Sequence, residues 1–123
     1  MGVFVSDYPN MFVVTGPQAP FANLPTSIEQ NMIYISRCIE KMEREGLDVF
    51  QPRPEAEKAW TTQTADIHGQ TLMAEGDKVN SWMMGANRDD KPARVLIYFG
   101  GAGAYYDALD KSAADGFPEV EFR

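Results

Sequence analysis

The chain has 123 residues, of which 44 % are hydrophobic and 24 % charged, as in an ordinary folded domain and unlike a disordered segment. Eighteen Asp and Glu residues against eleven Lys and Arg give a net charge of −7, so neither nucleic acid nor an anionic membrane is an expected partner. A single cysteine and a single histidine exclude an intramolecular disulfide and a zinc site of Cys and His ligands, and with no signal peptide evident they fit the reducing cytoplasm.

The first predicted element is a buried strand at residues 11–15, because its residues are apolar on both alternating faces. The next ten residues, Gly16–Pro25, hold three prolines and a glycine, which excludes regular structure there. This loop also carries Phe21 and Leu24, so we expect it to pack against another surface or a ligand rather than lie in solvent.

A long helix is predicted at residues 27–45. Two alternative capping-box pairs mark its start, Thr26 with Glu29 and Ser27 with Gln30. Gly46 is expected to end the helix. Cys38 lies inside this helix and is expected to be a small buried side chain rather than a nucleophile. Apolar residues recur at a spacing of 4, 3, 4 and 3 and predict one buried face. They are Ile28, Met32, Ile35, Ile39 and Met42.

A second helix is predicted from Pro54 to the low seventies. His68 lies in it and is expected at the edge of the core or in solvent rather than in a catalytic role. Residues 73–94 show no periodicity and resemble a functional lid or a linker. Because a linker is not expected to hold the apolar run Trp82–Met84, this segment is predicted to cover a surface. The expected inward-facing residues of the second helix are Ala56, Trp60, Thr64 and Ile67.

A second buried strand is predicted at residues 95–99, followed by a glycine-rich turn, a helix at 104–115 and a short strand at 120–122. This order resembles a dinucleotide-binding unit, whose glycines permit the close approach of a pyrophosphate. The first two glycine positions of that motif are occupied, but Tyr106 stands at the third and is too large for close helix packing. We therefore interpret the glycines as a flexible turn.

The loop at residues 16–25 is the better candidate for a ligand site. It leaves a predicted strand and delivers the chain to the N-terminus of a long helix, whose partial positive charge favours a polar or anionic group. Ligands of open α/β sheets also gather at the carboxyl ends of strands. A packed structural loop is the alternative interpretation.

Three motifs together resemble those of one known family. They are the run Tyr8–Gln30, the run Ser81–Asn87, and Tyr98–Gly101 followed by Ala104–Tyr106. In this order they resemble the C-terminal third of flavin-dependent Baeyer–Villiger monooxygenases of the cyclohexanone monooxygenase type. The resemblance implies an α/β fold, the C-terminal portion of a dinucleotide-binding flavoprotein fold with few strands, two long helices and one shorter helix. It also implies that residues 1–123 form a single domain, the C-terminal part of the FAD domain, with a control-loop segment at 73–94.

The function implied by the resemblance is that of an FAD- and NADPH-dependent monooxygenase, which inserts oxygen next to a ketone carbonyl to give an ester or lactone. This chain lacks the family's nucleotide-binding loops and its catalytic arginine, so no catalytic residue is assigned. Alone, the chain is expected to be inactive and to bind no cofactor. Two alternatives stay open: a small non-enzymatic α/β remnant, and an interaction module that self-associates or docks on a separate N-terminal half.

The resemblance also implies roles for single positions. Thr15, Gly16 and Pro17 match the turn beside the flavin ring, where a glycine lets the backbone come close. Trp82 matches the tryptophan of the control loop that closes over the nicotinamide cofactor, and Leu24 matches a position at both cofactor and substrate. The positions that match the apolar substrate pocket are Phe21, Ala22, Leu24, Ile97 and Phe99.

Overall fold

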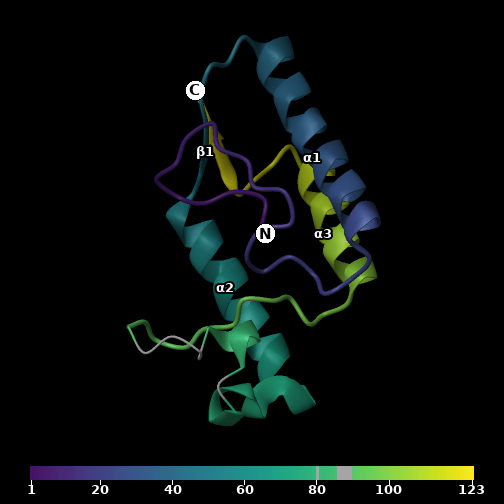
Figure 1. The fold of residues 1–123 in the computed structure, drawn as a ribbon. Helices are drawn as coiled ribbons and strands as arrows, with labels where there is room; N and C mark the ends of the chain where they lie inside the picture. The colour runs from purple at the N-terminus through teal and green to yellow at the C-terminus, as the bar shows by residue number, and fades with distance from the viewer. Residues whose placement is uncertain (80, 86–89) are drawn as a thin grey trace.

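The computed structural model describes residues 1–79, 81–85 and 90–123. Within these residues the chain forms three α-helices, two 3₁₀ segments and a two-stranded antiparallel ribbon (Figure 1). In chain order, the elements are α1 (Leu24–Glu45), β1 (Phe50–Pro52), α2 (Pro54–Gly69), η1 (Leu72–Val79), η2 (Trp82–Met84), α3 (Ala102–Ala114) and β2 (Val120–Phe122). An α/β chain with two longer helices and one shorter helix is therefore confirmed.

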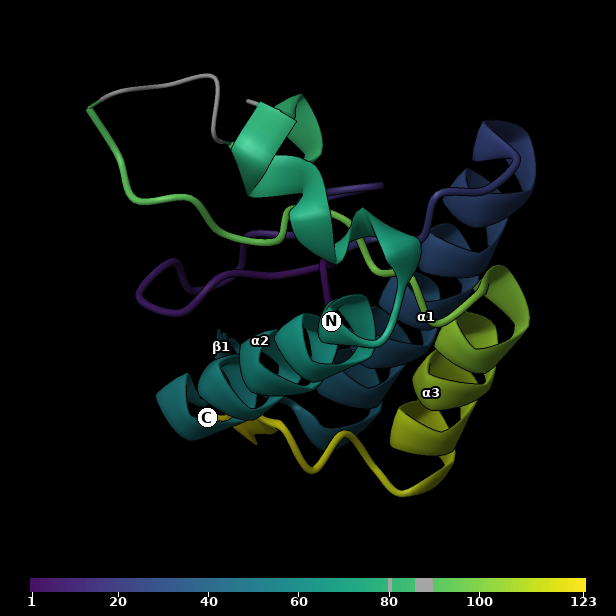
Figure 2. The same cartoon turned by 90° about the horizontal axis from the view of Figure 1, so that it is seen from below.

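The helices α1 and α3 lie side by side in both ribbon views, and α2 runs along the other side of the molecule (Figures 1 and 2). The ribbon joins residues far apart in sequence, since Phe50 of β1 pairs with Phe122 of β2 in antiparallel register. The segment that contains η1 and η2 projects at the C-terminal end of α2 (Figure 1).

The first helix begins three residues earlier than predicted. Its N-cap is Asn23, whose side chain accepts a hydrogen bond from the Thr26 backbone N–H at 3.3 Å. Proline in the first turn is compatible with this start, because its missing N–H has no partner there in any case. The predicted end is confirmed, since Gly46 adopts the left-handed conformation with φ 65°.

Neither predicted buried strand forms a strand. Residues 11–15 are irregular, because Asn10 and Thr15 have φ values of 59° and 50°, which interrupt an extended backbone. Residues 95–99 make one isolated parallel bridge, between Tyr98 and Pro20. Proline has no N–H to donate, so the ladder cannot continue past this point. The burial predicted for the second segment is nevertheless confirmed at Val95, Ile97 and Tyr98.

The core is rich in aromatic rings and lies between the helices and the ribbon. Trp60 of α2 stacks on Tyr98 with ring centroids 5.1 Å apart, and Tyr34 of α1 meets Phe117 edge to face at 5.3 Å. Cys38 is fully buried, as predicted, and burial raises the pKa of its thiol to about 12. The buried cluster consists of Val3, Phe4, Tyr34, Cys38, Phe50, Trp60, Tyr98, Tyr105, Leu109, Phe117 and Val120.

The apolar stripe of α1 is not its buried face, which corrects the prediction. Ile35 is 5 % exposed, but Ile28, Met32 and Ile39 are 42 %, 45 % and 42 % exposed. The buried face consists of Ser27, Asn31, Tyr34 and Cys38. The polar groups of the first three bond to α3, and Tyr34 and Cys38 belong to the core cluster. We call the exposed side the apolar flank of α1, formed by Leu24, Ile28, Met32 and Ile39.

The second helix begins at Pro54 as predicted but ends at Gly69, earlier than predicted. His68 is more deeply buried than predicted, whereas Ala56 and Ile67 are only half-buried. Trp60 and Thr64 are buried, and His68 is also buried, with its ring centroid 5.4 Å from that of Phe99.

The segment 73–94 is more regular than predicted, since it contains most of η1 and all of η2. Residues 80 and 86–89 of this segment lie outside the described residues. None of the described helices combines the length and apolarity needed to cross a bilayer.

Candidate functional site

The backbone of the turn Thr15–Pro17 is held by a side-chain hydrogen bond and by close packing. The N–H of Thr15, in the left-handed conformation, donates to Oδ1 of Asn31 at 2.9 Å. A Cβ atom on Gly16 would lie 2.6 Å from Cγ1 of Val13 and 2.7 Å from the carbonyl oxygen of Gly2. Glycine is therefore required here by the packing of the chain itself, a reason that the sequence pattern did not reveal.

Backbone hydrogen bonds bring three distant segments together at this turn. The Gln18 N–H donates to the Leu96 carbonyl at 2.7 Å, and the Tyr98 N–H donates to the Ala19 carbonyl at 3.0 Å. On its other side, the same segment bonds to η2, since the Leu96 N–H donates to the Met83 carbonyl at 2.9 Å. The proline-rich loop, residues 94–98 and η2 are thus joined into one assembly by backbone hydrogen bonds.

The five proposed substrate positions lie in or beside this assembly but do not enclose a cavity. Phe21 and Leu24 are 72 % and 60 % exposed, and Ala22 is half-buried. Ile97 is buried, and Phe99 is half-buried against the ring of His68. A cavity of about 210 Å³ lies behind the turn, but its walls include Pro17, Arg94 and Leu96 and none of these five residues. The apolar wall is therefore open on the side of Phe21 and Leu24.

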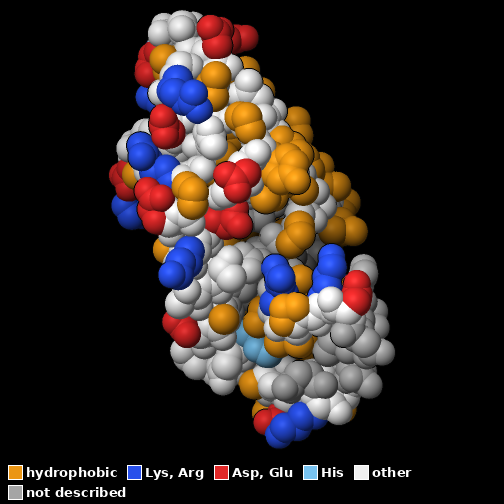
Figure 3. Space-filling view, turned by 90° about the vertical axis from the view of Figure 1, so that its left-hand side faces the viewer, with side chains coloured by type: hydrophobic (Ala, Val, Ile, Leu, Met, Phe, Trp, Pro, Cys, Tyr) orange, Lys and Arg blue, Asp and Glu red, His pale blue; other side chains and the backbone are white. Residues whose placement is uncertain are grey.

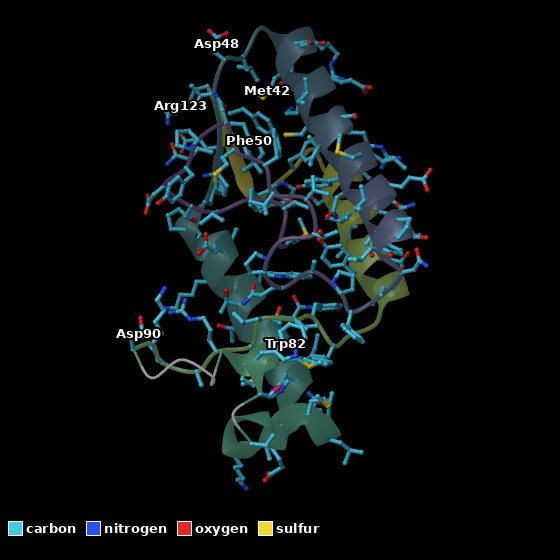
Figure 4. The ribbon with its side chains drawn as sticks, in the orientation of Figure 1. Met42, Asp48, Phe50, Trp82, Asp90 and Arg123 are labelled. Carbon is cyan, nitrogen blue, oxygen red and sulfur yellow. The ribbon has the colours of Figure 1, made fainter. Side chains whose placement is uncertain are left out.

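Trp82 lies in the half of the molecule away from Asp48 and Arg123 (Figure 4). The start of η2 is capped by Ser81, whose hydroxyl accepts from the Met83 N–H at 3.3 Å. The indole is 58 % exposed, while Met83 and Met84 are half-buried. The structure thus fixes the backbone beside Trp82 and leaves its ring available for another surface.

The N-terminus of α1 provides positive potential at the end of the proline-rich loop. Its first turn contains no acidic side chain, so the positive end of the helix dipole is not neutralised locally. The described residues contain no group of three or more His, Cys, Asp or Glu side chains placed to hold a metal ion. The arrangement suits an organic ligand with a polar or anionic edge and an apolar neighbour.

Sequence reasoning missed two buried polar residues behind the turn. Asn31 is fully buried in α1, and its Nδ2 donates to the Tyr105 hydroxyl of α3 at 3.3 Å. Burial raises the pKa of Tyr105 to about 12, so this hydroxyl is neutral at physiological pH. The available signal was the spacing of Ser27, Asn31, Tyr34 and Cys38, which also follows one helical face.

Hydrophobic side chains are also exposed beyond the five proposed substrate positions. On the face shown in Figure 3 they gather in one group along its upper right-hand side. The apolar flank of α1 adds residues that are between 42 % and 60 % exposed, namely Leu24, Ile28, Met32 and Ile39. Since a small soluble domain rarely leaves a contiguous apolar strip uncovered, the flank is a candidate contact surface.

No protein-family model matches the sequence. Among curated proteins, the chain is 43 % identical over 113 residues to the phenazine N-monooxygenase of Lysobacter antibioticus, a match that covers 92 % of this chain and 20 % of that protein. It is 39 % identical to the methyl acetate-forming acetone monooxygenase of Gordonia sp. strain TY-5, over 95 % of this chain and 22 % of that one. It is 42 % identical to the cyclohexanone 1,2-monooxygenase of Acinetobacter, over 85 % of this chain and 19 % of that protein.

Solved structures match in the same way. The NADP⁺-bound cyclohexanone monooxygenase of Rhodococcus sp. Phi1 superposes with a TM-score of 0.90 at 41 % identity, over 99 % of this chain and 22 % of that one. A closed crystal structure of cyclohexanone monooxygenase gives a TM-score of 0.91 at 42 % identity, again over 99 % and 22 %. The chain thus spans about a fifth of the length of the proteins that it matches.

Proposed function

The chain corresponds to about the C-terminal fifth of a Baeyer–Villiger monooxygenase of the cyclohexanone monooxygenase type, and on this premise we propose that it forms one wall of the active site of such an enzyme. The whole enzyme inserts an oxygen atom next to a ketone carbonyl and gives an ester or lactone. When bound, FAD supplies the oxygen-activating chemistry and NADPH supplies the electrons. The part of this chain is to position those groups and the ketone.

The turn Thr15–Pro17 is proposed to lie along the flavin ring. Its backbone is held rigidly by Asn31, which favours a precise contact. The uncompensated N-terminus of α1 is well suited to the electron-rich edge of the ring, and Leu24 at the start of that helix adds an apolar contact. These features fit the group that the family binds.

The ketone is proposed to lie against the open apolar wall. Phe21 and Leu24 present exposed apolar surface, Ala22 lies between them, and Ile97 and Phe99 support the neighbouring segment. An apolar wall excludes water and accepts a hydrocarbon ring without competing polar contacts. Because one relative is a phenazine N-monooxygenase, a nitrogen heterocycle is the second substrate class to test.

Trp82 is proposed to cover the nicotinamide part of NADPH. The exposure of its ring and the cap by Ser81 make it a flat apolar group on an ordered support. The backbone bond between Leu96 and Met83 couples this lid to the segment that carries Ile97. We therefore expect closure of this lid to be coupled to the position of the substrate wall.

The observation that carries this proposal is the apolar flank of α1. Met32, in the middle of this flank, is 45 % exposed although it belongs to a regular apolar repeat. A repeat of this kind is maintained when another surface buries it. We infer that the flank, together with the loop at 16–25, docks on the remaining four fifths of the flavoprotein, which supply the nucleotide-binding loops and the catalytic arginine.

The test is retention of flavin. The chain is purified alone and after co-expression with the N-terminal four fifths of a cyclohexanone monooxygenase, and bound flavin is measured by absorbance. We expect a colourless chain alone and a yellow complex. A yellow chain alone would contradict the need for the remainder, and a colourless, monomeric chain in both preparations would support the non-enzymatic remnant instead.

The chain offers a matched control for this experiment. Met32→Lys places a charge on the flank, whereas Ile33→Lys places it on the adjacent residue, which is 39 % exposed on a different side of α1. We expect the first variant to lose the complex and the second to keep it. Equal behaviour of the two variants would show that the flank is not the docking surface.

A further inference from the structure

Asn31 connects the proposed flavin-facing turn to the far helix of the fold. It is fully buried in α1, accepts from the Thr15 N–H at 2.9 Å and donates to the Tyr105 hydroxyl at 3.3 Å. We propose that Asn31 is the positioning residue of the Thr15–Pro17 turn, and that Tyr105 sets the orientation of its amide. The link from this turn to flavin rests on the proposed function, whereas the link from Asn31 to the turn rests on the geometry of this chain.

The hydrogen bonds can run in only one direction. The hydroxyl of Tyr105 has a single proton, which it donates to the carbonyl oxygen of Met1 at 2.8 Å. The same hydroxyl must therefore accept from Asn31, and only the Nδ2 end of the amide has protons to give. The acceptor end, Oδ1, is thereby turned toward Thr15, whose N–H needs an acceptor. A reversed amide would place two donors together at Thr15 and two acceptors together at Tyr105.

The turn needs this support because Thr15 is strained. A β-branched residue at φ 50° lies in a region that such residues rarely occupy. Relaxation of Thr15 to a negative φ would move Gly16, whose carbonyl oxygen accepts from the Ala19 N–H at 3.0 Å and closes the turn. Asn31 thus controls the conformation of the turn without lying on its ligand-facing side.

The first experiment uses the chain alone and follows amide hydrogen exchange at Thr15 by NMR. Asn31→Leu has nearly the same shape but no acceptor, and we expect exchange at Thr15 to become about tenfold faster, as for the loss of one hydrogen bond. Asn31→Asp keeps an acceptor oxygen and is expected to restore slow exchange. The Val13 amide, bonded to the Val3 carbonyl at 2.8 Å, is the internal reference.

Two further variants keep the experiment decisive if Asn31→Leu fails to fold. Tyr105→Phe removes the group that orients the amide and is expected to accelerate exchange at Thr15 but not at Val13. Ser27→Ala is the matched control, because Ser27 is 1 % exposed on the same face and bonds to Tyr106 at 2.9 Å. Unchanged exchange at Thr15 in both Asn31→Leu and Tyr105→Phe, or equal acceleration in Ser27→Ala, would overturn the proposal.

The second experiment measures the reduction potential of flavin in the complex with the remaining four fifths of the enzyme. Asn31→Leu is expected to shift the potential, Asn31→Asp to restore it, and Ser27→Ala to leave it unchanged. A wild-type complex without flavin would refute the proposed function, while the exchange data would still decide the role of Asn31. If the reduction potential of the bound flavin is the same in Asn31→Leu as in the wild type, Asn31 has no positioning role at the flavin.

Discussion

Gly16 is the residue at which the backbone leaves no room for a side chain. A Cβ atom there would meet both Val13 and the carbonyl oxygen of Gly2 at less than 3.0 Å. We expect Gly16→Ala to lower the free energy of unfolding by about 1–3 kcal/mol, the usual cost of overpacking. Urea denaturation measures this change.

Gly103 provides the control for that substitution. It lies in α3, and an added Cβ would meet no atom within 4 Å. Gly103→Ala is therefore expected to stabilise the chain by up to about 1 kcal/mol, because alanine favours the helix. Equal effects at Gly16 and Gly103 would contradict the tight packing of the turn.

The ionisation of Tyr105 is expected to make the free energy of unfolding depend on pH in the alkaline range. Burial raises its pKa from the ordinary value of 10.0 to about 12, which corresponds to roughly 3 kcal/mol. Between these two values the unfolded chain is ionised while the folded chain is not, so the contribution of Tyr105 is complete below pH 10 and is lost as the pH rises toward 12. Buried Tyr34 and Cys38, whose pKa values are also raised, act in the same direction.

Urea denaturation at several pH values tests this dependence. We expect the free energy of unfolding to fall from about pH 9 upward, and Tyr105→Phe to make that fall smaller. The variant is compared with the wild type at pH 7 as well, because it also removes two hydrogen bonds. An identical alkaline decline in both chains would show that Tyr105 ionises freely.

The two sides of α1 differ in how much they contribute to folding. Ile35 is 5 % exposed and Ile39 is 42 % exposed, although both belong to the same apolar repeat. Ile35→Ala is expected to cost about 2–5 kcal/mol, and Ile39→Ala less than about 1 kcal/mol, in the isolated chain. If Ile39→Ala is as costly as Ile35→Ala, the flank belongs to the core of this chain and is not a docking surface.

The helices were predictable from sequence because their signals are local. Gly46 ends α1 by its own conformation, and Pro54 suits the first turn of α2. The inner face of α1 was not predictable in the same way, since Ser27 and Asn31 are buried through bonds to tyrosines more than seventy residues away. Hydrophobic periodicity assigns a polar residue to the surface and cannot anticipate such a partner.

The predictions of buried strands at residues 11–15 and 95–99 were wrong for a related reason. Apolar composition correctly indicated that residues 95–99 are buried, but strand formation also needs a partner with free N–H groups, and Pro20 interrupts it. The candidate site was located by motif resemblance, and the structure brings its three segments together by backbone bonds. The five proposed substrate positions do not enclose a pocket, and under the proposed function this chain supplies only one of its walls.

At the scale of the whole molecule, the chain is a folded part with an uncovered side. Its core, ribbon and helices are complete, yet the flank of α1, Phe21 and Trp82 remain exposed. The chain spans only a fifth of the length of its relatives, and under the proposed function the rest of the flavoprotein covers these exposed residues.

Ketone-dependent oxidation of NADPH tests this account most directly. It is measured for the chain, for the N-terminal four fifths of a cyclohexanone monooxygenase, and for the two purified together with FAD. We predict no ketone-stimulated oxidation by either part alone and clear stimulation by the complex, lost with Met32→Lys and kept with Ile33→Lys. Flavin-dependent, ketone-stimulated oxidation by the chain alone, or a stable complex that remains inactive, would contradict the account.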